Sequence, residues 1–388
     1  MDPEKKRYQF LDSLRGLAAL LVVFHHIFTG NIVSLMEQYH LNVPAFFLYN
    51  FTHSGVELFF VLSGVVLLRP YIRTQRAVNL RQFYYRRFRR IYPPYLGALV
   101  FSASVIWVIH EQPTWYSKII IPFTLQEAIS QAAIFNFDSQ YYNLAWWSLQ
   151  IEVLFYLCVP PILYLFSRNV RFTSRSLWTV VMITLLCTTV LQVYLTAYYP
   201  SIYSYNRVAL VLYKFIDYPV CFILGVYLAA TDSSLKEAVH FIVAGVLLVL
   251  LSYAYLPVLY TGYGFIYAGL IIFAFYRARL RQYLEKPLLI WLGERSYSLF
   301  LTHFSVLYLI NFTVSHFTPG RNLVYGFFTR ALALPLSLFV AMLLFHFVER
   351  RYAKGLHTAN AFWPWNALRP KEQKGEQALP ETAGTSIV

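Results

Sequence analysis

Charged residues are scarce in this sequence of 388 residues, because only 13% are Asp, Glu, Lys or Arg, whereas 58% are hydrophobic and 19% aromatic. The scarcity excludes an ordinary soluble domain, in which about 25% of the residues are charged. A net charge of +14 would suggest a nucleic-acid partner for a soluble protein, but here the basic residues are confined to a few loops between apolar stretches. The composition therefore predicts an integral membrane protein that contacts membrane lipids and no nucleic acid.

Cysteine is rare as well, and Cys158, Cys187 and Cys221 each fall inside an apolar stretch. This placement excludes a disulfide framework and argues against a metal cluster, so we expect three buried apolar side chains and no metal. The sequence also lacks an internal repeat, a large soluble domain and a short N-terminal segment with a cleavage site. We therefore expect its first apolar run to remain as a membrane span.

Apolar segments of roughly 20 residues, the length that crosses a bilayer as a helix, recur along nearly the whole chain. They predict spans at 12–33, 52–68, 91–111, 144–167, 176–198, 208–230, 239–258, 260–276, 288–313 and 323–349. The stretch 113–137 is apolar but broken by Pro122, which suits a re-entrant or interfacial segment better than an eleventh crossing. The sequence thus predicts an all-α bundle of about ten transmembrane helices in one domain, residues 1–356.

The distribution of Lys and Arg predicts how this bundle is oriented. Nineteen of them fall in alternate loops or before the first span, and the opposite loops hold only Lys118, Arg207 and Arg321. Basic residues are retained on the cytoplasmic side, so both termini are expected in the cytoplasm. The polar segment 357–388 is expected to be a disordered cytoplasmic tail.

The first span carries two ionisable groups on one helix face. From Arg15 to His26 is eleven residues, which at 100° per residue is about 20° beyond three full turns, whereas His25 misses that face by about 80°. The rise of roughly 16 Å places Arg15 near the cytoplasmic surface and His26 near the middle of the bilayer. This stripe suggests a channel leading to a reacting group, or else a snorkelling arginine and a hydrogen-bonded histidine.

Two carboxylates also fall inside predicted spans, Glu57 in the second and Glu152 in the fourth. A buried carboxylate is protonated, paired with a cation such as Arg15, or faces water, and each of these is typical of a functional site. Near Glu57, the small residues Gly55, Ser63 and Gly64 favour close helix packing.

A cluster of four arginines, Arg86, Arg87, Arg89 and Arg90, lies in the predicted loop before the third span, after Arg69. Anionic lipid head groups and a phosphorylated ligand explain this cluster equally well. In the ninth span, Ser296 and His303 share a face at a spacing of seven, although His303 is also explained as a core histidine.

Aromatic residues gather before the fourth span, at Tyr141, Tyr142, Trp146 and Trp147. They are suited to stacking on a sugar ring, and equally to an aromatic belt at the membrane surface.

Five pieces of the sequence together resemble the acyltransferase 3 family of membrane-bound acyltransferases. They are LDSLRGLAALLVVFHH at 11–26, SGVELFFVLSG at 54–64, FYYRRFRRIYPPYL at 83–96, WWSLQIEVLFYL at 146–157 and SYSLFLTH at 296–303. The resemblance covers about residues 7–350. The family's arginine and histidine separated by ten residues match Arg15 and His26, and its basic motif before the third span matches Arg87 and Arg90.

The resemblance implies a cell-membrane O-acyltransferase, in the plasma or inner membrane if the source is bacterial. Such an enzyme takes an acyl group, usually acetyl, from cytoplasmic acyl-CoA and places it on a carbohydrate hydroxyl of an exopolysaccharide, O-antigen or lipid-linked sugar. Some members add an extracytoplasmic esterase-like domain, for which this chain has no room. We therefore expect the membrane domain to act alone or with separate polysaccharide assembly proteins.

Combining residues and resemblance gives an expected site. His26 is expected to act as general base or to relay the acyl group, with Glu152, or less readily Glu57, orienting it. The arginines expected to hold the coenzyme A phosphates are Arg15, Arg69, Arg87 and Arg90. Arg15 is also expected to be one of the catalytic residues. Substrate-binding or supporting roles are expected for Glu57, Ser63, Trp147, Ser148, Ser296 and His303.

Two other functional classes compete with the enzyme. Intramembrane charges also line the paths of transporters, so a flippase of a lipid-linked sugar is the first alternative. Its expected signs, paired broken helices in two related halves, are not found in the sequence. The second alternative is an inactive relative that serves as a scaffold.

Overall fold

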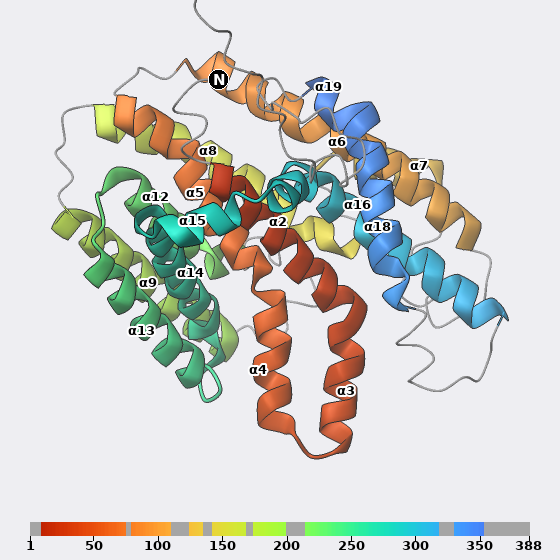
Figure 1. The fold of residues 1–388 in the computed structure, drawn as a ribbon, viewed down its shortest axis with the longest axis horizontal. Helices are drawn as coiled ribbons and strands as arrows, with labels where there is room; N and C mark the ends of the chain where they lie inside the picture. Colours follow the sequence, from red (N-terminus) through yellow and green to blue (C-terminus); the bar gives the residue numbers. More distant parts are fainter. Residues whose placement is uncertain are drawn as a thin grey trace, which may run out of the picture.

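The computed structural model describes residues 9–74, 79–109, 124–134, 142–167, 174–198, 214–317 and 330–352, and all the regular elements among them are helices (Figure 1). In chain order they begin with α2 (Gln9–Phe24), the π-helix η1 (His25–Thr29), α3 (Gly30–Gln38), α4 (Asn42–His53), α5 (Gly55–Thr74), α6 (Leu80–Ile109), α7 (Leu125–Ala132), η3 (Leu144–Trp146), α8 (Trp147–Ser167) and α9 (Ser174–Tyr198). They continue with α12 (Pro219–Ala230), α13 (Leu235–Leu251), η4 (Leu256–Val258), α14 (Leu259–Tyr276), α15 (Ala278–Leu284), α16 (Pro287–Phe317), α18 (Ala333–Leu344), the π-helix η5 (Phe345–Glu349) and α19 (Arg350–Tyr352).

Within the described residues, eight helical segments are long and apolar enough to cross a membrane: Gln9–Gln38, Asn42–Ile72, Leu80–Ile109, Leu144–Tyr164, Ser174–Leu195, Leu259–Tyr276, Pro287–Val314 and Ala333–Tyr352. They confirm the predicted all-α membrane architecture. The spans predicted at 208–230 and 239–258 correspond to α12, described over 12 residues, and α13, with 17. The count of ten and the cytoplasmic termini therefore stay predictions.

Several predicted segments lie outside the described residues, namely the tail at 357–388, Tyr141, and the loop residues Lys118, Arg207 and Arg321. Of the segment predicted to be re-entrant, the structure describes α7, which has 8 residues and is about 12 Å long, too short to cross a bilayer. This helix is held against α6, where the Tyr95 hydroxyl donates to the Gln131 carbonyl at 2.6 Å.

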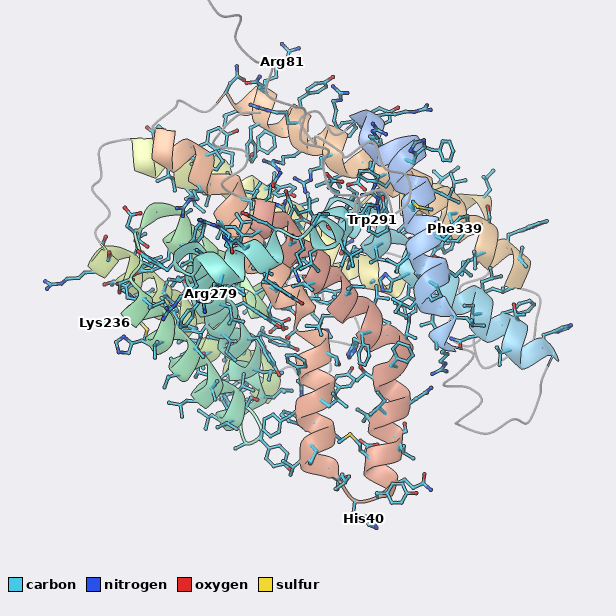
Figure 2. The ribbon with its side chains drawn as sticks, viewed as in Figure 1. His40, Arg81, Lys236, Arg279, Trp291 and Phe339 are labelled. Carbon is cyan, nitrogen blue, oxygen red and sulfur yellow. The ribbon has the colours of Figure 1, made fainter. Side chains whose placement is uncertain are left out.

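The first two spans extend further than the sequence predicted. Gln9–Gln38 contains 30 residues and is about 45 Å long, whereas the hydrocarbon core is about 30 Å thick. The excess, α3, pairs with α4 as a helical hairpin that projects from the bundle (Figure 1), and His40 lies at its tip (Figure 2). The loop expected between residues 33 and 52 is therefore mostly helical.

The helix is interrupted at Ser54, between α4 and α5. The Ser54 hydroxyl donates to the Phe51 carbonyl at 2.7 Å and also forms a short hydrogen bond with the Tyr267 hydroxyl of α14. Gly55 then lies against the Ala18 carbonyl of α2, where a side chain would have no room. The break therefore fixes the end of α4 and the start of α5 at one place beside α2.

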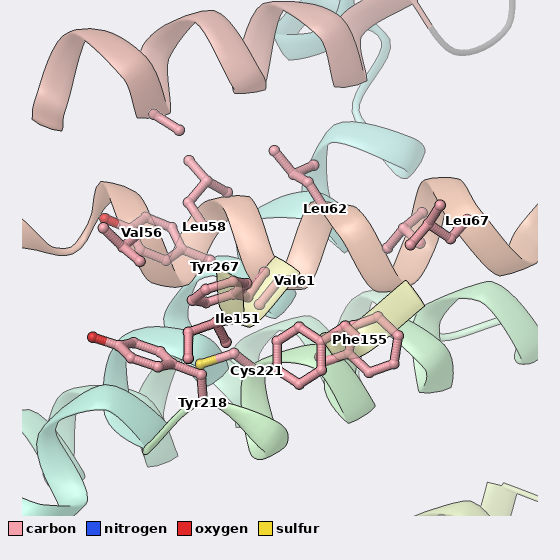
Figure 3. Packing of buried hydrophobic residues seen from close by; sticks show 14 of the residues in the cluster. Val56, Leu58, Val61, Leu62, Leu67, Ile151, Phe155, Tyr218, Cys221 and Tyr267 are labelled. Carbon is pink, nitrogen blue, oxygen red and sulfur yellow. The ribbon is translucent and has the colours of Figure 1, made fainter. Parts of the chain in front are cut away.

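The helix α5 lies inside the bundle and is covered from several sides. Figure 3 shows Val61 of α5 near Phe155 of α8 and Cys221 of α12, with Leu62 on the opposite side of α5, all of them buried. Where α5 meets α12, the backbones of Gly64 and Gly225 are in contact. The small residues near Glu57 thus serve helix packing, as the sequence predicted, and α5 cannot shift without disturbing three neighbours.

The cysteines lie on three different helices, α8, α9 and α12, as free thiols. Cys221 is buried, as expected, but Cys187 is exposed, because α9 lies at the edge of the bundle with little of its surface covered.

The helices α2 and α16 approach each other through Gly16 and Gly293. A Cβ atom on Gly16 would lie 2.7 Å from the Gly293 nitrogen, whereas a Cβ atom on Gly30, in α3, would meet nothing within 4 Å. This close contact sets the distance between the helices that carry Arg15 and Ser296.

We predict that Gly16→Ala lowers the melting temperature relative to Gly30→Ala. Both variants gain helix propensity, so their difference isolates the overpacking at Gly16, which costs about 1–3 kcal/mol. The measurement is the fraction of monodisperse protein after heating in detergent. Equal melting temperatures for the two variants would contradict the close packing of α2 on α16.

Candidate functional site

A cavity between α2, α5, α6, α8 and α16 gathers three arginines from two helices. Its polar lining includes Arg15 of α2, Arg87 and Arg90 of α6, Glu152 and Tyr156 of α8 and Ser296 of α16. Ser63 of α5 also lines it. We call it the arginine cavity. Residues from Arg15 to Phe300, near opposite ends of the described chain, are thus brought together.

Helical periodicity divides the arginine cluster of α6 into two faces. Arg87 and Arg90 are three residues apart, so they lie on one face and line the arginine cavity. Arg86 is exposed and donates to the Gln82 carbonyl, and Arg89 lies 5.6 Å from the Tyr85 ring on the outside. The segment predicted as a loop is therefore a helix, and only half of its arginines face the cavity.

Charges in the arginine cavity are only partly compensated. Arg15 pairs with Asp12 at 3.1 Å, and the Glu152 carboxylate accepts a hydrogen bond from the Tyr156 hydroxyl at 2.5 Å. The Arg87 Nε atom is buried, and no hydrogen-bond partner is found for it among the described residues. A buried guanidinium N–H without an acceptor is costly, so this cavity is suited to an anionic ligand such as a phosphate.

Glu349 is a site residue that the sequence reasoning missed. It ends the π-helix η5, is 2% exposed, and accepts a hydrogen bond from the Ser298 hydroxyl of α16 at 2.5 Å. It also interacts electrostatically with Arg90. The signal in the sequence is an acidic residue inside the last apolar run. Because the basic residues Arg350 and Arg351 follow it directly, it resembles the polar end of an ordinary membrane span.

A second cavity adjoins the first on the side of the α3–α4 hairpin. Its polar lining is His25 and His26 of η1, His53 of α4, and Trp147 and Ser148 of α8. We call it the histidine cavity. Val56, Ser148 and Phe300 line both cavities, so the two meet at these residues.

The two cavities connect the ends of the stripe predicted on the first span. Arg15 lines one and His26 the other, eleven residues or about 16 Å along the helix. His25, which an ideal α-helix turns away, also lines the histidine cavity, because η1 is a π-helix and widens the turn at this point. Short π-helical turns inside α-helices are frequent at functional sites, and η5 is another.

The ring of His26 is held by a second histidine. His26 Nδ1 lies 3.0 Å from His303 Nε2, and His303 Nδ1 lies 2.9 Å from the Phe300 carbonyl oxygen. Because a carbonyl only accepts, His303 carries its proton on Nδ1, and its unprotonated Nε2 accepts from His26 Nδ1. The neutral His26 ring is left with an unprotonated Nε2, the form that a general base requires.

The described hydrogen-bond partner of His26 is therefore His303, and not one of the two carboxylates expected to orient it. Glu152 belongs to the arginine cavity, and Glu57 lies 4.0 Å from His53. Among the described residues, no group of three or more His, Cys, Asp or Glu side chains is arranged to hold a metal ion.

Arg69 does not join the other three arginines. Its guanidinium donates to the Leu228 carbonyl at 2.9 Å, lies over the Phe275 ring at 4.5 Å, and lines a separate cavity with Arg281. Leu67 of the same helix lines the arginine cavity, and two residues later the helix has turned by about 200°, which places Arg69 on the other face.

Two of the aromatic residues before α8 are buried and are therefore not part of an aromatic belt at the membrane surface, one of the two interpretations of these residues. Tyr142 and Trp146 are both 1% exposed, and the Trp146 indole donates to the Leu301 carbonyl of α16 at 3.2 Å. The same carbonyl accepts from the Asn143 amide at 2.8 Å. These two bonds anchor the start of α8 on α16 and so position Trp147, which lines the histidine cavity, beneath the Lys214 ammonium group 5.2 Å away.

Comparisons with known proteins show what the chain is similar to. The model of a family described as an acyltransferase domain matches residues 8–346. The chain is 28% identical to the O-acetyltransferase OatA of Staphylococcus aureus, with 92% of this chain and 59% of the relative covered. It is 25% identical to the peptidoglycan O-acetyltransferase OatA of Listeria monocytogenes, with the same two shares. It is 27% identical to the putative peptidoglycan O-acetyltransferase YrhL of Bacillus subtilis, with shares of 88% and 54%.

The chain thus spans less than two thirds of the length of these curated relatives. No solved structure matches it significantly. The similarity covers nearly all of the membrane-spanning segments, which place the protein in the cell membrane as a multi-pass protein.

Proposed function

The chain belongs to the family whose members carry this acyltransferase domain, and from this premise we propose that it transfers an acyl group, most simply acetyl, from cytoplasmic acyl-CoA to a carbohydrate hydroxyl. The observation that carries the proposal is the pair of adjoining cavities, one lined by arginines and the other by histidines. The catalytic unit is the domain of residues 1–356, and the tail at 357–388 takes no part in it.

In the arginine cavity, Arg15, Arg87 and Arg90 bind the phosphates of coenzyme A, because guanidinium groups match phosphate oxygens in charge and geometry. In the absence of acyl-CoA, Glu152 and Glu349 balance part of the arginine charge and so reduce the repulsion between the guanidinium groups. Ser63 and Ser296 line the path of the pantetheine arm. Arg69 lies on the other face of α5 and is left out of this group.

In the histidine cavity, His26 acts as the general base. Its Nε2 takes the proton of the acceptor hydroxyl while the hydroxyl oxygen attacks the thioester carbonyl carbon. The C–S bond then breaks, and the imidazolium returns the proton to the departing thiolate, so that the base is regenerated. His303 is a positioning residue, because it fixes the tautomer and the orientation of His26.

The acceptor is a carbohydrate, and relatives named as peptidoglycan O-acetyltransferases favour a peptidoglycan sugar. The histidine cavity lies on the side of the α3–α4 hairpin, away from the arginines, so the acceptor enters from the membrane face opposite to the donor. Trp147 and Ser148 line its path.

The test is acyl transfer by the purified protein in liposomes, with labelled acetyl-CoA as donor and peptidoglycan fragments as acceptor. We expect alkali-labile label in the carbohydrate. Saturable acetyl-CoA binding without transfer to any carbohydrate offered would contradict the acceptor class. If the protein neither bound acetyl-CoA nor transferred acetyl, a transporter or an inactive scaffold would explain the structure better than an enzyme.

We predict that His303→Phe lowers kcat by about tenfold to a hundredfold, as the loss of an orienting partner of a functional histidine typically does. The ring volume is kept, but the acceptor of the His26 Nδ1 proton is lost. His316→Ala, at an exposed position of the same helix, is the control and should retain wild-type kcat. A wild-type kcat for His303→Phe would remove His303 from the mechanism.

A further inference from the structure

The histidine cavity contains another histidine with a different kind of partner. His53 is the last residue of α4, Glu57 lies in the first turn of α5, and the break at Ser54 separates the two helices. His53 Nδ1 lies 4.0 Å from Glu57 Oε1. His53 lines the same cavity as His26, but the general-base mechanism gives it no role.

We propose that His53, backed by Glu57, donates a hydrogen bond from Nε2 to the thioester oxygen as that oxygen becomes an oxyanion during acyl transfer. This inference rests on the function proposed above and adds to it the group that stabilises the transition state. His53 would then be a catalytic residue, and Glu57 its positioning residue.

The protonation of the pair follows from the burial of Glu57. Its side chain is 1% exposed, and no hydrogen-bond partner is found for its Oε2 atom among the described residues. An isolated carboxylate in such a place is unstable, so the pair holds one shared proton and is neutral overall.

Both arrangements of that proton leave a hydrogen on His53 Nε2. If Glu57 is ionised, His53 is an imidazolium and both ring nitrogens carry hydrogen. If Glu57 is protonated, its hydroxyl donates to His53 Nδ1, and the proton of the neutral ring is on Nε2. The separation of 4.0 Å is longer than a hydrogen bond, and catalytic hydrogen bonds are often long in the absence of substrate.

His26 and His53 therefore present opposite polarity to one cavity. His303 accepts from His26 Nδ1 and so leaves His26 Nε2 unprotonated, whereas Glu57 supplies a proton to the His53 pair. A base and a donor that face the same reacting carbonyl are what acyl transfer requires, since the base activates the nucleophile and the donor stabilises the oxyanion.

Other polar groups near the carbonyl are less suited to this role. The Ser148 hydroxyl, where the two cavities meet, already donates to the Ala145 carbonyl, at 3.5 Å. His25 is held by the Thr52 hydroxyl at 3.0 Å. The Lys214 ammonium group lies 5.2 Å from the centroid of the Trp147 ring and interacts electrostatically with Glu57 and with His53.

The test is the kinetics of acetyl transfer by the full-length protein in liposomes, with kcat and the KM for acetyl-CoA measured separately. We expect His53→Ala to lower kcat by about a hundredfold to a thousandfold and to leave this KM within about twofold, because only the transition state carries the oxyanion. His53→Gln should regain about tenfold or more of the lost kcat, since its amide N–H occupies the place of Nε2–H. His240→Ala, at an exposed position of α13, is the control.

Glu57 is tested by two variants of similar size. Glu57→Gln should stay within about tenfold of wild-type kcat, because its amide N–H can donate to His53 Nδ1, whereas Glu57→Leu should fall about tenfold further. If the wild type transfers acetyl but His53→Ala does so equally well, or His53→Gln is as slow as His53→Ala, the inference fails and the proposed function stands. If the wild type transfers nothing, the proposed function itself has failed.

Discussion

His26→Ala is expected to lower kcat for acetyl transfer by about a thousandfold, within the range that a positioned general base contributes. The substitution removes the Nε2 atom that accepts the acceptor's proton, and it leaves the arginine cavity untouched, because His26 does not line that cavity. Binding of acetyl-CoA should therefore keep its wild-type affinity. The measurement is kcat in liposomes together with calorimetric titration of acetyl-CoA.

The control for this prediction is His26→Gln, which keeps a polar side chain of similar reach but has no basic nitrogen. It should be as slow as His26→Ala. If either variant transferred acetyl at the wild-type rate, His26 would not be the base, and the hydrogen bond from His26 to His303 would have only a structural role.

Arg87→Ala is expected to weaken acetyl-CoA binding by about tenfold to a hundredfold. The Arg87 Nε atom is buried and has no acceptor among the residues that the structure describes, so it can donate to a phosphate oxygen in the arginine cavity. A hydrogen bond to a charged group is worth about 1.5–3 kcal/mol. The effect should appear in Kd and in KM. The measurement is titration of acetyl-CoA into protein in detergent.

Arg86→Ala is the matched control, because Arg86 is the adjacent residue of the same helix but is exposed outside the cavity. Its Kd should stay within about twofold of wild type, since an exposed charge is screened by solvent and salt. If Arg86→Ala and Arg87→Ala weakened binding equally, the arginines would act only through their summed surface charge, and the cavity would not be the donor site.

Local features of the site could be predicted from the sequence, because helix geometry fixes them. The spacing of eleven residues places Arg15 and His26 on one side of the first span, and the structure brings them to two adjoining cavities. The same geometry divides Arg87 from Arg86, although the sequence reasoning treated the segment as a loop and did not apply it.

Partners that lie far apart in the sequence could not be predicted in this way. His303 is 277 residues from His26, and nothing in either span indicates that α16 packs on α2 closely enough for their rings to meet. A carboxylate is the more familiar partner for a catalytic histidine, so Glu152 was expected beside His26, whereas the side chain hydrogen-bonded to His26 is that of His303. Arg69 was grouped with the other arginines by charge, but it lies on the opposite face of α5.

Glu349 and Glu57 are two buried carboxylates whose partners differ in how far the sequence predicts them. Each is an acidic residue in an apolar segment, which indicates a functional role. Ser298 meets Glu349 only because η5 packs on α16, whereas His53 lies four residues before Glu57, a spacing at which residues face each other on a helix. Sequence alone thus identifies the ionisable groups in apolar segments, and the structure identifies the partners that other helices supply.

The central claim is that donor and acceptor reach one reaction centre from opposite membrane faces through the two cavities. The most direct measurement compares liposomes that enclose labelled acetyl-CoA, with a membrane-impermeable peptidoglycan fragment outside, against liposomes with both reactants outside. We predict labelled carbohydrate in the first arrangement and essentially none in the second, whatever the orientation of the protein in the bilayer. Transfer that requires both reactants on the same side would contradict the claim.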